Sequence, residues 1–126
     1  MSATTDHAGR PIIAITGIGV VSSLGQGWQD NWRNLTAGKS GIHRISRFPT
    51  DHLRTTIAGT IDFMCDASTS ALDRTYVFAH AATQEAVAQS GLPIDNFGGP
   101  LVVAAPPVEL DWAQRIAIDA AADAGD

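Results

Sequence analysis

The amino-acid sequence predicts an α/β fold with a mainly parallel sheet and helices on both faces. Two short runs, 11–17 and 100–105, are apolar almost throughout and rich in β-branched residues, as expected of strands buried on both faces. Segments with an apolar residue every three or four positions lie between and after these runs, which indicates helices. The alternation of strand and helix favours a sheet connected by right-handed crossovers.

The sequence of the N-terminal third predicts a tail, then a strand, a turn and a helix. Residues 1–9 are small and polar and are expected to be a flexible tail, which leaves 10–126 as one folded unit. The strand at about 12–17 is followed by a glycine-punctuated turn over 17–25. The next segment, 27–37, has an apolar stripe at helical spacing, and Gly38 supplies a left-handed stop.

The middle of the chain predicts a loop, a strand and the longest helix. Residues 39–54 have no steady period and are expected to be an ordered loop, whereas 55–61 alternate and predict a strand. A helical period then runs from about Thr69 to Ser90, and Gly91 ends it. Four apolar positions of this helix should pack on the sheet: Leu72, Tyr76, Ala79 and Val87.

The C-terminal part predicts one more strand and one more helix. Pro106 and Pro107 stop the strand at 100–105, and a helix should begin near Val108. The sequence stops directly after this helix, where the α/β alternation leads us to expect another strand. We therefore expect a chain that is cut short.

Composition excludes several classes of function. The 126 residues carry 8 basic and 13 acidic side chains, a formal net charge of −5, and the basic residues are scattered, so no nucleic-acid partner is expected. No apolar run approaches the roughly 20 residues of a membrane span, and no secretory signal is present. One cysteine excludes an internal disulfide and a cysteine-based zinc site, which favours a reducing, cytoplasmic location.

Gly17-Ile18-Gly19 follows a predicted strand and invites a dinucleotide-binding interpretation. The third glycine of the G-x-G-x-x-G pattern is Ser22 here, and no acidic residue lies at the expected distance. The other interpretation is that the glycines allow a tight turn and close packing.

The sequence offers no convincing candidate for a catalytic, metal-binding or cofactor-binding residue. Cys65 has Asp66 beside it, which disfavours a thiolate, so a structural thiol is the better interpretation. The four histidines show no metal-ligand spacing; they are His7, His43, His52 and His80.

Six segments, in one consistent order over about residues 11–105, resemble the β-ketoacyl-acyl-carrier-protein synthases. They comprise an opening strand and turn, a segment of the A-G-K-S-G-I type, an Arg-Phe pair, a short strand, the start of a helix and the end of that helix. In this chain they are Ile13–Gly25, Ala37–Ile42, Arg47-Phe48, Ile57–Ile61, Leu72-Asp73-Arg74 and Ala82–Leu92.

The resemblance implies a condensing enzyme of the thiolase fold. Such enzymes join an acyl thioester to a malonyl unit on acyl carrier protein with loss of carbon dioxide, generally work as dimers, and need no metal or organic cofactor. Their nucleophile is a cysteine in a T-A-C-S-x-G setting, and two later histidines assist. None of these motifs occurs here, and Cys65 lies too early, so no catalytic residue is carried over.

Two departures from the family pattern concern the surface. After the third strand the family has a glycine-rich turn, whereas this chain has Pro106-Pro107, which restrict the backbone. The family also places a basic cluster before the Leu72-Asp73-Arg74 position to receive acyl carrier protein. Residues 66–71 contain no basic side chain, so carrier docking would have to use other arginines of this chain or an unusual partner.

Three hypotheses follow. In the first, the chain is the N-terminal portion of a 3-oxoacyl-acyl-carrier-protein synthase-like enzyme of fatty acid or polyketide biosynthesis, inactive alone and part of a homodimer or heterodimer when complete. The second is a non-catalytic, chain-length-factor-like partner or scaffold subunit. The third is an unrelated α/β domain that binds a nucleotide near Gly17 and Gly19.

Overall fold

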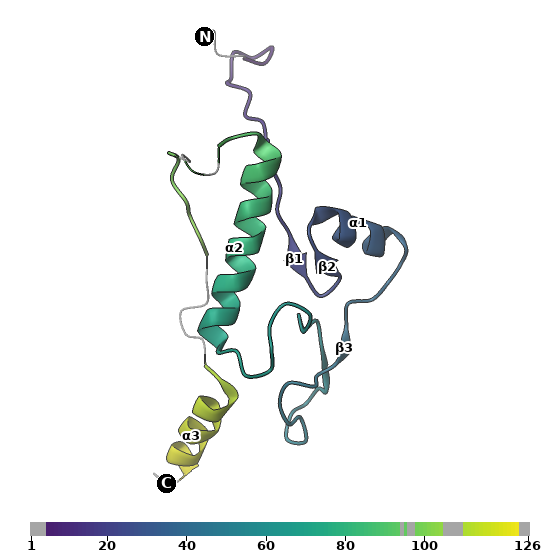
Figure 1. Ribbon diagram of the computed structural model, residues 1–126, viewed down its shortest axis with the longest axis vertical. Coiled ribbons are helices and arrows are strands. Elements are labelled where there is room, and N and C mark those ends of the chain that lie inside the picture. The colour runs from purple at the N-terminus through teal and green to yellow at the C-terminus, as the bar shows by residue number, and fades with distance from the viewer. Residues whose placement is uncertain (1–4, 94, 96–97, 105–109, 124–126) are drawn as a thin grey trace.

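The computed structural model describes residues 5–93, 95, 98–104 and 110–123. Its longest element is helix α2 (Ala71–Ser90), which lies at the centre of the molecule in Figure 1. The other two helices are α1 (Trp28–Thr36), beside the middle of α2, and α3 (Trp112–Asp123), beyond the N-terminal end of α2.

The strands form two small antiparallel pairs. The first is a hairpin of β1 (Val21–Ser22) and β2 (Gly25–Gln26), which pairs Ser22 with Gly25. The second joins β3 (His43–Arg44) to β4 (Ile57–Ala58). The predicted strand at 55–61 is therefore confirmed only at its centre. Its partner lies in the segment 39–54, which we expected to be a loop.

The segment 17–20 lies directly against the backbone of α2 and runs antiparallel to it. A Cβ atom on Gly17 would meet the carbonyl oxygen of Ala86 at 1.9 Å, and one on Gly19 would meet that of Ala82 at 1.7 Å. Two residues of extended chain rise about 6.6 Å, and four residues of helix rise about 6.0 Å. The distance between the two glycines therefore matches the distance between the carbonyl groups of Ala82 and Ala86. The prediction that these glycines allow close packing is confirmed.

The helix ends agree with the local sequence signals. The Ser70 side chain caps α2 by accepting a hydrogen bond from the Asp73 amide at 3.1 Å. Gly91 ends the helix with φ +74°, and Gly38 follows α1 with φ +69°, both in the left-handed region that glycine adopts without strain. The last helix was predicted from Val108. The described part of it begins at Trp112, and residues 105–109, including both prolines, lie outside the described residues.

The predicted parallel sheet is not present among the described residues. Residues 12–17 and 101–104 belong to no strand pair, and the side chains of Ile13 and Val102 are 89% and 90% exposed. The physical reason is that a parallel strand needs neighbouring strands at its edges and helices on its faces. The chain places α2 beside the first run but supplies no adjacent strand in the described part.

Several apolar helix positions are consequently open to solvent. Val87 of α2 is buried, as predicted, but Leu72 and Tyr76 are 73% and 67% exposed. The stripe of α1 is also uncovered, with Trp32 62% exposed. The chain exposes 9785 Å² in all, whereas a compact monomer of this mass exposes about 6,400 Å². The fold therefore presents a large uncovered apolar surface.

The first described residues contact one another. Asp6 pairs with Arg10 at 2.8 Å, and Thr5 forms a bridge with Pro11.

None of the helices in the described ranges is long and apolar enough to span a bilayer.

Replacing Gly19 with alanine tests the close approach of this segment to α2. The added Cβ would collide with the Ala82 carbonyl group, so we expect the free energy of unfolding to fall by about 1–3 kcal/mol, as for other overpacked sites. Chemical denaturation provides the measurement. Gly98→Ala is the matched control, because a Cβ there meets nothing within 4 Å. Equal stability of the two variants would contradict the packing described.

Candidate functional site

Side chains of α2 accept hydrogen bonds from the backbone N–H groups of the glycine-rich turn. The Ile18 amide donates to Gln89 Oε1 at 2.5 Å. The Val20 amide donates to Glu85 Oε2 at 2.9 Å, and the Trp28 amide to Glu85 Oε1 at 2.8 Å. A phosphate group would need such N–H groups free, and the Glu85 carboxylate would repel it. The structure therefore argues against nucleotide binding at Gly17 and Gly19.

Asparagine side chains of α1 fix the hairpin to that helix. Asn31 Nδ2 donates to the carbonyl oxygens of Gly25 and Gly27 at 2.9 and 2.8 Å, and Asn31 Oδ1 accepts a hydrogen bond from the Ser22 hydroxyl. Asn34 Nδ2 donates to the Leu24 carbonyl oxygen at 2.6 Å. The turn is thus held by side chains of α2 on one side and of α1 on the other.

Cys65 lies in a partly buried position on a small cavity of about 330 Å³. The residues that line this cavity include Asp62 and Asp66 and no basic side chain. A thiolate is stabilised by nearby cations or a helix N-terminus, and this environment supplies carboxylates instead. The structure gives no support to Cys65 as a nucleophile, and its structural role stays a prediction.

His43, Thr60 and Asp62 form a polar cluster at the end of the β3–β4 pair. Thr60 Oγ1 lies 2.6 Å from both His43 Nε2 and Asp62 Oδ2, and His43 Nε2 lies 3.1 Å from Asp62 Oδ2. The other ring nitrogen, His43 Nδ1, is 3.1 Å from the Gly41 carbonyl oxygen. The Thr60 hydroxyl, followed by His43, holds the pKa of Asp62 below its usual 3.8, against a smaller opposing effect of burial.

The remaining histidines show no common site. His80 stacks on Tyr76 with ring centroids 5.5 Å apart, and His7 and His52 are exposed. Within the described ranges no three histidine, cysteine or acidic side chains are grouped so as to hold a metal ion. The sequence-based expectation of no metal and no cofactor stays a prediction.

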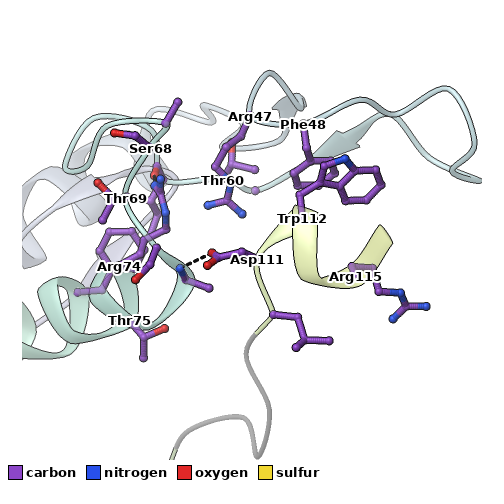
Figure 2. A pocket seen from close by; sticks show the side chains of 17 residues that line it. Arg47, Phe48, Thr60, Ser68, Thr69, Arg74, Thr75, Asp111, Trp112 and Arg115 are labelled. Carbon is purple, nitrogen blue, oxygen red and sulfur yellow. Dashed lines mark hydrogen bonds between the residues drawn. The ribbon is translucent and has the colours of Figure 1, made fainter. Parts of the chain in front are cut away.

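A cavity of about 820 Å³ lies at the N-terminal end of α2. Residues 47–48, 59–61, 67–71, the first turns of α2 and the start of α3 surround it (Figure 2). Arg74 is 6% exposed, and its guanidinium donates to the carbonyl oxygens of Ile61 and Asp66 at 3.4 and 2.7 Å. Asp111 Oδ1 accepts the Ala71 amide at 2.6 Å.

The sequence alone does not reveal this cavity, because its walls come from four separate parts of the chain. The Arg47-Phe48 pair stands out there only through the family resemblance. Phe48 stacks on Trp112 with centroids 5.0 Å apart and an interplanar angle of 12°. No local pattern connects two aromatic residues so far apart in sequence.

Comparison with known proteins assigns most of the chain to one family. Residues 11–105 match the family described as the β-ketoacyl synthase, N-terminal domain. The chain belongs to this family. As a β-ketoacyl synthase N-terminal segment, it places two of its resembling motifs in direct contact, since Gly17 and Gly19 of the first lie on Ala86 and Ala82 of the last.

Relatives include proteins named as polyketide β-ketoacyl synthases and as 3-oxoacyl-[acyl-carrier-protein] synthases. A granaticin polyketide β-ketoacyl synthase of Streptomyces violaceoruber is 40% identical over 64% of this chain and 20% of its own length. The 3-oxoacyl-[acyl-carrier-protein] synthase 2 of Coxiella burnetii is 38% identical over 71% of this chain and 23% of its own. A tetracenomycin ketoacyl synthase alpha subunit of Streptomyces glaucescens is 37% identical over 70% and 22%. The chain thus spans about a fifth of the length of these relatives.

Replacing Thr60 with valine tests the origin of the lowered Asp62 pKa. The substitution removes the hydroxyl that contributes most, so the pKa should rise toward 3.8, as followed by NMR titration of the carboxyl carbon. A depressed pKa stabilises the fold above the unfolded-state pKa, and this contribution is lost as pH falls through the folded-state value.

The variant should therefore lose less stability than the wild type over that acid range. Thr55→Val is the control, because the Thr55 hydroxyl bonds to the backbone of Ile57 and not to Asp62. An unchanged Asp62 titration in Thr60→Val would contradict the assignment.

Proposed function

We propose that the chain is the N-terminal part of a condensing enzyme that lengthens an acyl chain bound to acyl carrier protein. In this reaction the malonyl unit loses carbon dioxide, and its α-carbon forms a bond to the acyl carbonyl carbon as the acyl group leaves the enzyme thiol. The match over 11–105 carries the proposal. The sequences that would supply the nucleophilic cysteine and the two histidines are not in this chain.

We further propose that residues 12–17 and 100–105 are strands of a thiolase-like, mainly parallel sheet. Three observations support this. The segment 17–20 runs antiparallel to α2, as a strand does to the helix of a βαβ unit. Residues 12–17 have no strand partner in the described part, and the Ile13 and Ile15 side chains are 89% and 84% exposed. In this proposal 10–126 is part of one thiolase-like domain and 1–9 its tail.

The partners of the complete protein belong to the same proposal. Acyl carrier protein would be the substrate carrier, and a second synthase chain, identical or related, would complete a dimer. The segment 66–71 lacks basic residues, so it should attract an acidic carrier weakly. A cytoplasmic location stays a prediction.

The proposal is tested by complementation. The chain is co-expressed with the Coxiella synthase from which the segment matching residues 11–105 has been removed, and carbon dioxide release from malonyl-carrier is measured. We expect release with the wild-type chain and much less with Gly19→Ala. A stable complex without release would contradict the proposal and favour the non-catalytic partner. Failure of the two chains to associate would also contradict it.

A separate prediction concerns the chain by itself. Cys65 has carboxylates around it rather than cations, so incubation with a long-chain acyl thioester should give no acyl adduct, as read by mass spectrometry. Cys65→Ser should change the free energy of unfolding by at most about 1–2 kcal/mol. A stoichiometric adduct on Cys65 that turns over with malonyl-carrier would contradict the prediction.

A further inference from the structure

We propose that the 820 Å³ cavity at the N-terminal end of α2 binds a small organic anion with one carboxylate group and a flat apolar body. This inference goes beyond the proposed condensing activity and does not depend on it. A cavity of this size lies in the range of small-molecule sites. Its lining combines the two features such a ligand needs, namely an available cationic group and an apolar wall.

The cationic group is Arg47. Figure 2 shows its guanidinium directed into the hollow between Thr60 and Asp111. It lies 5.8 Å above the centroid of the Phe48 ring. It is near enough to Asp62 to contribute to the lowered pKa of that carboxyl, but no hydrogen bond or ion pair to it occurs within the described ranges. A guanidinium fork matches the two oxygens of a carboxylate. Arg47 is therefore positioned to bind one.

The electrostatic setting favours a monoanion. Three arginines and one aspartate line the cavity, a formal charge of +2 in a chain whose net charge is −5. Arg74 is committed to two carbonyl groups and Arg115 to Asp119, at 3.1 Å. Asp111 faces the same space as Arg47 (Figure 2). Because Asp119 neutralises Arg115, the charges that remain, those of Arg47, Arg74 and Asp111, sum to +1, which a single carboxylate balances.

The apolar wall is formed by residues from three segments. The stacked Phe48 and Trp112 rings lie at one side, and Leu110 and Phe78 also line the hollow. Aromatic rings attract a further flat ring by offset stacking or edge-to-face contact at their free faces and edges. Hydroxyl groups of Thr60, Ser68 and Thr69 border the polar side. The ligand would place its carboxylate toward Arg47 and its apolar body toward Phe48 and Trp112.

The test uses the full 126-residue chain and three matched probes: 2-naphthoate, 2-naphthyl phosphate and the neutral 2-naphthalenemethanol. Binding is followed by the NMR shift of the Trp112 indole N–H. We expect saturable binding of 2-naphthoate, about tenfold tighter than the neutral probe. Arg47→Met should remove this preference. Arg33→Met is the control, because Arg33 pairs with Asp30 on the far element α1.

The outcomes separate the possibilities. Equal affinity for 2-naphthoate and 2-naphthalenemethanol would show apolar binding alone and overturn the proposal. Tighter binding of 2-naphthyl phosphate than of 2-naphthoate would overturn the choice of a carboxylate. Unchanged affinity in Arg47→Met would overturn the role of Arg47. Since Arg47 is exposed, the variant should fold, and an unaltered indole spectrum without probe verifies that it does.

Discussion

The carboxylate of Glu85 is the group on which the arrangement of the N-terminal half depends. From the C-terminal half of α2 it accepts hydrogen bonds from the amides of Val20 and Trp28. The Trp28 amide belongs to the first turn of α1, where the helix dipole favours a negative charge. One side chain thus satisfies the backbone of the glycine turn and caps a second helix. It joins α2, the turn and α1 into one unit.

Gly17 and Gly19 determine how closely the 17–20 segment can approach α2. Only a residue without Cβ can lie where Gly17 and Gly19 lie on the carbonyl groups of α2. One side of the 17–20 segment packs against α2, whereas the apolar run 12–16 that precedes it remains uncovered. Ile13 and Ile15 then face solvent, a situation that neighbouring strands and a covering layer would relieve.

Local signals in the sequence predicted the helices well because each helix end depends on a few adjacent residues. Gly91 ends α2 and Gly38 follows α1, as predicted, because glycine adopts a positive φ without strain. The observed α2 begins after Ser70, within two residues of the predicted start at Thr69. The strands were predicted less well, because pairing depends on distant segments. Apolar content predicted strands at 12–17 and 100–105. The observed strand pairs, β1–β2 and β3–β4, lie in other segments and are short and antiparallel. The β1–β2 hairpin was missed because side chains of α1 and α2 stabilise it, and these lie outside its own sequence. The cavity near Arg47 was missed for the same reason.

The most direct test of the role of Glu85 is amide hydrogen exchange in Glu85→Gln. A glutamine side chain has one acceptor oxygen where the carboxylate has two, so it can serve only one of the two amides. We predict that exchange at Val20 or Trp28 accelerates, and that neither changes in the control Gln84→Ala, an exposed neighbour on α2. Unchanged protection of both amides in Glu85→Gln would contradict the claim that this carboxylate holds the turn and α1 to α2.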